Sequence, residues 1–155
     1  MAKISFRVGI DADIHGVYEA LTDRAEIRRW WTEVCEIEPV AGSLGRVDFK
    51  PDAAWVEFGI AALVPDRLVE WQVTDSWMVE TEDWNGTVIR FRLSGDEQGG
   101  TVLDFTHSGW KEEGRCFVAC TDGWEFYLRD SLKRYLETGA GEPYPEYLES
   151  RAASG

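Results

Sequence analysis

Residues 56–73 read VEFGIAALVPDRLVEWQV, and this stretch decides the fold class. Apolar side chains occupy every second position from Val56 to Val64 and again from Val69 to Val73, which is the period of a half-buried strand. The dipeptide Pro65-Asp66 between the two runs is typical of a turn. The stretch therefore predicts two antiparallel strands joined by a short turn, each with one face in the core and one in solvent.

The same alternation continues on both sides of this hairpin, over residues 34–105. Further turn residues divide it into six runs: Gly42-Ser43, Pro51-Asp52, Asn85-Gly86 and Gly99-Gly100. A seventh alternating run, residues 4–10, comes before them. We therefore expect a curved antiparallel sheet of seven strands with one solvated face.

Segments whose apolar residues recur with a helical period lie before and after the six-strand region. Asp13 and Asp23 can each cap a short helix after the first strand. A longer helix follows Gly114, and its broad apolar stripe contains Phe117, Cys120, Thr121, Trp124, Leu128, Ser131, Leu132, Tyr135 and Leu136. Gly139 should end it. The prediction is an α+β domain, β-α-α-β6-α, over residues 1–138, with a C-terminal tail at 139–155.

The net charge and the cysteine content limit the possible partners and the cellular location of the protein. The net charge of −13 disfavours nucleic acid and anionic membrane surfaces, and no apolar run approaches the ~18 residues of a membrane span. Three cysteines, Cys35, Cys116 and Cys120, are an odd number without a disulfide-framework spacing. We therefore expect a cytoplasmic protein without nucleic-acid or membrane partners.

Eight tryptophans in 155 residues are more than a packed interior of this size accommodates easily. We therefore predict an aromatic pocket between the sheet and the long helix. The residues expected to line it are Trp30, Trp31, Phe58, Trp71, Phe105, His107, Trp110, Cys120 and Trp124. The alternative for each single ring is that it fills the core.

His107 shares the inward parity of Leu103 and Phe105. It can be a hydrogen-bonded polar group of the pocket or a general acid or base, and no carboxylate on its strand face could orient it for catalysis. With Cys116 and Cys120 it could also form a soft metal site. Unpaired cysteines on an apolar helix face are more often small hydrophobic residues, so we predict no metal and no cofactor.

The segment 75–84 combines four acidic residues with Trp77, Met78 and Trp84. It can be a lid or a partner surface. The alternative is a solvated hairpin whose rings fold back onto the sheet.

Four motifs in this order carry a resemblance to a known superfamily: Ala20-Leu21-Thr22-Asp23 leading to Trp30-Trp31, Gly59 through Pro65-Asp66-Arg67-Leu68-Val69 to Trp71, Thr106-His107-Ser108-Gly109-Trp110, and Gly123-Trp124 with Leu128, Leu132 and Leu136. With them the chain resembles the START-like (SRPBCC) superfamily, and in particular the branch named after the activator of the heat-shock-protein-90 ATPase. The resemblance implies the helix-grip fold of the birch pollen allergen and the polyketide cyclases.

Three functions remain open at this point. The first is binding of a small hydrophobic or aromatic molecule in the internal pocket, as a monomer or homodimer, and the ring-rich interior favours it. The second is a cyclase or hydrolase that uses His107 as acid or base, which the superfamily includes. The third is a chaperone-associated activator, which only the branch name suggests.

Overall fold

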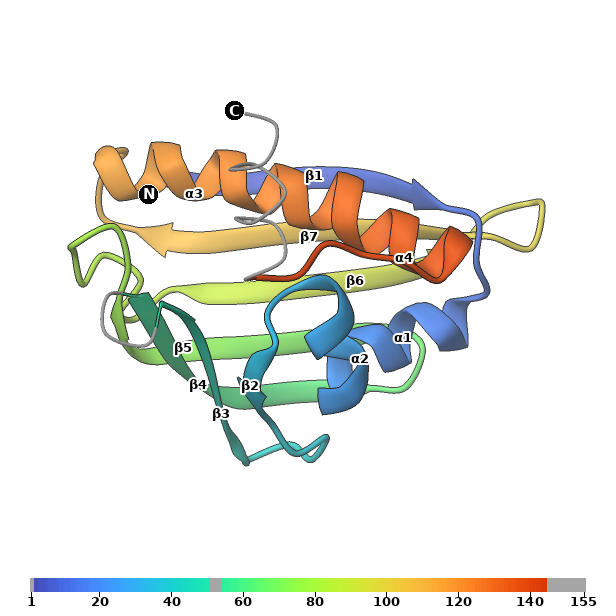
Figure 1. Ribbon diagram of the computed structural model, residues 1–155, viewed down its shortest axis with the longest axis horizontal. Helices are drawn as coiled ribbons and strands as arrows, with labels where there is room; N and C mark the ends of the chain where they lie inside the picture. The colour runs from blue at the N-terminus through green and yellow to red at the C-terminus, as the bar shows by residue number, and fades with distance from the viewer. Residues whose placement is uncertain (1, 51–53, 145–155) are drawn as a thin grey trace.

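The computed structural model describes residues 2–50 and 54–144 of the chain. Its elements are β1 (Ala2–Ile10), α1 (Ile14–Thr22), α2 (Arg24–Trp30), β2 (Val34–Glu36), β3 (Leu44–Lys50), β4 (Ala54–Val64), β5 (Leu68–Trp77), β6 (Val88–Gly95), β7 (Thr101–Trp110), α3 (Arg115–Glu125), η1 (Phe126–Leu132) and α4 (Lys133–Thr138). The last three form one long helix (Figure 1). The predicted α+β class and element order are confirmed.

All seven strands form one antiparallel sheet in the order β1-β7-β6-β5-β4-β3-β2. The first strand therefore pairs with the last, with Ile4 opposite His107 and Phe6 opposite Phe105. The helices cover one face of this sheet, and the long C-terminal helix runs beside β1 and β7 (Figure 1). Sheet and helices together confirm the helix-grip fold, because the apolar face of the sheet is buried under the helices.

At the end of β4 the side chains face the opposite side of the sheet from the side predicted. The register shifts between Ile60 and Ala62, so Val64 lies opposite Leu68 and is 46% exposed, while Leu63 packs against the core. The expectation that Ala62 and Val64 continue the inward face is therefore wrong. A β-bulge inserts one extra residue, which reverses the side-chain parity beyond it.

The long helix is not a regular α-helix throughout. Its middle part, η1, is π-helical, with α3 before it and α4 after it. A π-helical turn holds more residues than an α-helical turn, so the face that each later residue presents is shifted. Tyr127, near the start of η1, lines a cavity beside Trp124, while Leu128 and Leu132 are fully buried.

The chain beyond the long helix continues as part of the folded domain. Tyr144 donates its backbone N–H to the carbonyl of Trp31 and accepts from the N–H of Glu33, both at 2.9 Å. The predicted tail, residues 139–155, is thus packed as far as residue 144. Residues 145–155 of that tail lie outside the described residues.

Gly141 allows this segment to approach α2. A Cβ at this position would lie 2.5 Å from the carbonyl oxygen of Arg29 and 3.2 Å from the hydroxyl of Ser131. We expect Gly141→Val to lower the free energy of unfolding by ~1–3 kcal/mol, because the backbone oxygen cannot move aside. Urea unfolding followed by circular dichroism measures the change, with Ala140→Val, on an exposed neighbour, as the matched control. Equal losses in the two variants would contradict the close approach.

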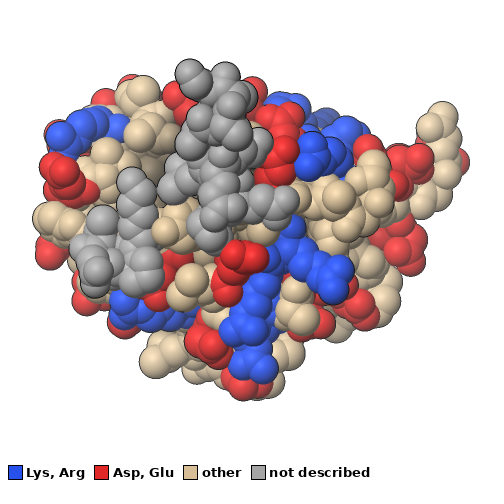
Figure 2. Space-filling view, in the orientation of Figure 1, with Lys and Arg blue, Asp and Glu red and all other residues tan. Residues whose placement is uncertain are grey.

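Charged side chains of both signs are interspersed on the face shown in Figure 2. Glu36 of β2, for example, accepts from Arg24 at 3.0 Å and from Arg28 at 2.8 Å. None of the helices in the described parts of the chain is long and apolar enough to cross a membrane.

Candidate functional site

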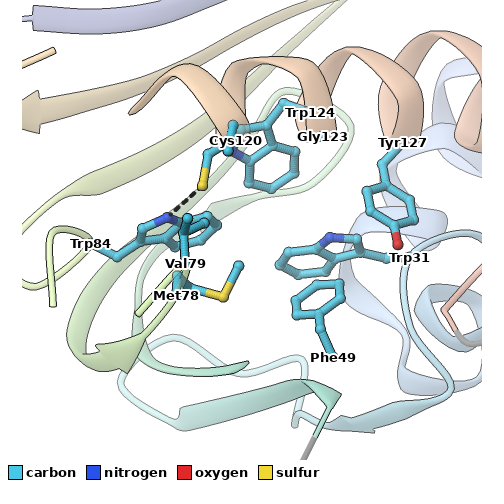
Figure 3. A pocket seen from close by; sticks show the side chains of 10 residues that line it. Trp31, Phe49, Met78, Val79, Trp84, Cys120, Gly123, Trp124 and Tyr127 are labelled. Carbon is cyan, nitrogen blue, oxygen red and sulfur yellow. Dashed lines mark hydrogen bonds between the residues drawn. The ribbon is translucent and has the colours of Figure 1, made fainter. Parts of the chain in front are cut away.

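A cavity of about 190 Å³ lies between the long helix, β3 and the hairpin that follows β5 (Figure 3). Its aromatic walls are Trp31, Phe49, Trp84, Trp124 and Tyr127. Its smaller side chains are Met78, Val79, Ala119, Cys120 and Gly123. Such a set of mainly apolar and aromatic walls is typical of a site for a small apolar molecule.

Gly123 keeps the helical wall of the cavity open. A Cβ at this position would meet no other atom within 4 Å, so it would project into free space. Glycine inside a helix costs roughly 0.5–1 kcal/mol relative to alanine. The helix therefore carries a destabilising residue at a point where a side chain would reduce the cavity.

A tight hairpin forms the opposite wall. Met78 and Thr81 exchange two backbone hydrogen bonds of 2.9 Å, and the two residues between them, Val79 and Glu80, have φ angles of 52° and 59°. These angles belong to a type I′ turn, which favours Asn-Gly over β-branched residues such as valine. Arg115 of α3 donates to the Val79 carbonyl at 2.9 Å and so ties the turn to the helix.

Stacked rings separate the cavity from the sheet. Trp31 lies between Trp124 and Trp71, with ring centroids 5.2 Å and 5.8 Å away, and Trp71 stacks on Phe58 at 4.7 Å. The Nε1 of Trp71 has no hydrogen-bond partner and is the only such buried side-chain N or O atom among the described residues. The base of the site is thus a continuous aromatic layer.

The structure divides the nine predicted pocket residues into two groups. Trp31, Cys120 and Trp124 line the cavity. The other six are at most 1% exposed and lie in the packed core: Trp30, Phe58, Trp71, Phe105, His107 and Trp110. Phe105 illustrates the reason, because Trp124 covers it at a centroid distance of 4.6 Å and so separates it from the cavity.

His107 has a hydrogen-bond partner on each ring nitrogen. The indole N–H of Trp124 donates to Nδ1 at 3.0 Å, and an indole nitrogen can only donate. Nδ1 is therefore the acceptor, and the ring proton is on Nε2, which donates to the hydroxyl of Thr87 at 2.8 Å. Thr87 in turn donates to the carbonyl of Trp84 at 2.6 Å.

This chain of donors fixes His107 as the neutral Nε2–H tautomer. Burial lowers its pKa to about 3, because the charged ring would lose its hydration without gaining an anionic partner. Both nitrogens are committed to buried partners, so neither is directed at the cavity. The geometry makes His107 a structural group that orients Trp124, one wall of the site.

Cys116 and Cys120 lie one helical turn apart on α3, and their sulfur atoms are 3.5 Å from each other. All three cysteines, including Cys35, are free thiols. Within residues 2–50 and 54–144, no group of three or more His, Cys, Asp or Glu side chains is placed to hold a metal ion. The nitrogens of His107 bond to Trp124 and Thr87 and not to the cysteines.

Several wall residues were not predicted from the sequence. Phe49 and Tyr127 could have been found, because Phe49 shares strand parity with Val47 and Tyr127 follows Trp124 at a helical spacing of three. Met78 and Trp84 belong to the segment predicted as a lid, a partner surface or a solvated hairpin. In the structure Trp84 is buried against His107 at a centroid distance of 4.5 Å, while Trp77 is 38% exposed.

Three solved structures show the same fold. The solution structure of an Aha1 dimer from Colwellia psychrerythraea has a TM-score of 0.80 and 34% identity, and the match covers 91% of this chain and all (100%) of that one. A Staphylococcus saprophyticus protein has a TM-score of 0.71 at 20% identity, covering 90% of this chain and 95% of that one. An AHSA1-like protein from Aeromonas hydrophila has a TM-score of 0.67 at 20% identity, covering 89% and 94%.

No curated protein matches the sequence. The family described as "activator of Hsp90 ATPase homolog 1-like protein" matches residues 11–137, which include six of the seven strands and all the helices of the described structure except the last residue of α4. The chain therefore belongs to the activator of Hsp90 ATPase homolog 1-like family.

Proposed function

We propose that this protein binds a small, planar, apolar or aromatic molecule in the cavity between α3, η1, β3 and the hairpin after β5. The observation that carries the proposal is the open space at Gly123, inside a wall of five aromatic rings. A dry cavity of about 150 Å³ in another protein is known to hold benzene. The cavity of about 190 Å³ is therefore of the right size for a molecule of one or two fused rings.

The net charge of the protein also indicates which charge the ligand carries. The net charge of −13 disfavours an anionic ligand, whereas a neutral molecule is unaffected and a cationic group would be tolerated beside the indoles. We infer that the ligand is neutral or weakly cationic.

The contacts of His107 favour ligand binding as the function over catalysis by this residue. A general acid or base must reach the proton that it moves. His107 is fully buried (0% exposed), its two nitrogens bond to Trp124 and Thr87, and it does not line the cavity.

Filling the cavity should abolish binding without harming the fold. We expect Gly123→Leu to weaken the binding of 1-aminonaphthalene by at least ~30-fold, because the new side chain occupies the ligand's space. Its melting temperature should not fall, since leucine is a better helix former than glycine by up to ~1 kcal/mol. Fluorescence titration measures the first effect and thermal unfolding the second.

The matched control is Val118→Leu, on the same helix at a position that is 59% exposed. This variant should bind 1-aminonaphthalene with the same affinity as the wild type. The proposal fails if none of the three compounds 1-aminonaphthalene, indole and naphthalene raises the melting temperature of the wild type. It also fails if Gly123→Leu binds the dye as tightly as Val118→Leu does.

A further inference from the structure

Cys116 and Cys120 form a dithiol beside the cavity. Cys120 lines the cavity and is 7% exposed, whereas Cys116 lies one helical turn away and is 0% exposed. Their sulfur atoms are 3.5 Å apart, and both are free thiols. A reactant that enters the cavity thus meets Cys120 first and has a second sulfur within reach.

The indole of Trp84 polarises this pair. Its Nε1–H donates to the sulfur of Cys120 at 3.2 Å (Figure 3). The hydrogen bond between the two sulfurs lowers the pKa of Cys116 to about 7, while the same contact raises the pKa of Cys120. The pKa of Cys116 is thus shifted in the direction that favours its thiolate, and thiolates are the reactive form.

The distance between the sulfurs selects the kind of atom that could join them. With bonds of roughly 2.3 Å, as in thiolate–zinc sites, sulfurs 3.5 Å apart subtend an angle of about 100° at a bridging atom. An ion that prefers two ligands in a line would need them roughly 4.6 Å apart with the same bonds. A tetrahedral structural metal needs four protein ligands, and the described residues offer no group of even three. A trivalent arsenic atom with one organic substituent needs two sulfurs and is pyramidal, with angles close to this one.

We propose that Cys116 and Cys120 are a dithiol site for an aromatic ligand that carries a trivalent, thiol-reactive metalloid centre, with its ring in the adjoining cavity. This inference rests on the proposed function, because the cavity supplies the binding surface for the ring. The apolar walls of the cavity would enclose that ring, and the sulfurs would hold the metalloid.

The reaction with phenylarsine oxide balances without an oxidant. The bonds between arsenic and oxygen break, and one bond forms from arsenic to each sulfur. The two thiol protons leave with the oxygen as one molecule of water, and arsenic stays trivalent.

The test uses phenylarsine oxide on the intact chain and on single-cysteine variants. We expect native mass spectrometry to show one bound phenylarsenic group on the wild type and on Cys35→Ala, whose thiol is not part of the pair. Cys116→Ala and Cys120→Ala should each bind at least ~100-fold more weakly in the presence of glutathione, because one sulfur cannot chelate. Arsenic X-ray absorption on the wild type should give two sulfur neighbours, and this result needs no variant.

The site is wrong if the absorption spectrum shows one sulfur neighbour, or if neither cysteine replacement changes the affinity. Gly123→Leu separates this inference from the proposed function. If the wild type binds 1-aminonaphthalene but not the arsenical, the dithiol site is wrong and the pocket stands. The reverse result is that Gly123→Leu and the wild type take up the arsenical equally and neither of them binds the dye. In that case the two cysteines do bind arsenic, but the proposed pocket is wrong, and so is the placement of the ring in it.

Discussion

His107→Leu is expected to lower the free energy of unfolding by roughly 3 kcal/mol, because it leaves the buried indole N–H of Trp124 without an acceptor and removes the bond to Thr87. Leucine fills a similar volume, so the loss reports mainly on hydrogen bonding. Urea unfolding at neutral pH measures it. Fluorescence of Trp124 should also change, since its ring loses the bond that orients it.

His107→Gln is the matched variant. A glutamine amide is neutral and offers both a donor and an acceptor, so it can replace the two bonds in part. We expect it to cost ~1 kcal/mol. The assigned chain of donors would be wrong if leucine were tolerated as well as glutamine.

Acid is expected to destabilise the wild type through the same residue. In the unfolded chain a histidine takes up its proton near the ordinary pKa of 6.5, whereas in the folded protein the pKa of His107 is about 3. Between these values the unfolded state binds more protons, so His107 contributes its full stability above pH 6.5, and this contribution falls as the pH drops toward 3. The slope approaches ~1.4 kcal/mol per pH unit.

The measurement compares wild type and His107→Gln in urea between about pH 7 and pH 4.5. Carboxylates titrate in both proteins and cancel in the difference. His15 is also present in both, and its hydrogen bond to Asp66 raises its pKa, so it favours folding at low pH and cannot imitate the effect. The stability of the wild type relative to the variant should fall by roughly 2–3 kcal/mol over this range, so that its small advantage at neutral pH is reversed in acid. A constant difference would show that His107 is not held neutral.

The topology could be predicted from the sequence because each strand and helix has its own period. Alternation identified seven strands, and the stripe from Phe117 to Leu136 identified the long helix. Where the period changes inside an element, prediction from parity failed. The bulge after Ile60 reversed the face of Val64, and the π-helical turns of η1 were not predicted. Neither change has a marker in the residue types.

The candidate site could be predicted only in part, because parity gives the face of a residue and not its depth. Trp71 and Phe105 do face inward, yet Trp31 and Trp124 cover them. The hairpin residue Val79 was missed for a different reason. A type I′ turn normally carries Asn-Gly, and Val79-Glu80 gives no such signal.

The pairing of β1 with β7 has a consequence for how the chain matures during synthesis. Ile4 and its partner His107 are separated by about a hundred positions, and a ribosome adds ~5–20 residues per second. The N-terminal strand therefore waits for several seconds without its neighbour, and the nascent chain meanwhile has β6 as an open edge. Closure of such distant ends is slow compared with local helix formation. The newly made polypeptide thus passes through a stage in which apolar sheet residues and an unpaired strand edge are exposed, and such a stage favours aggregation.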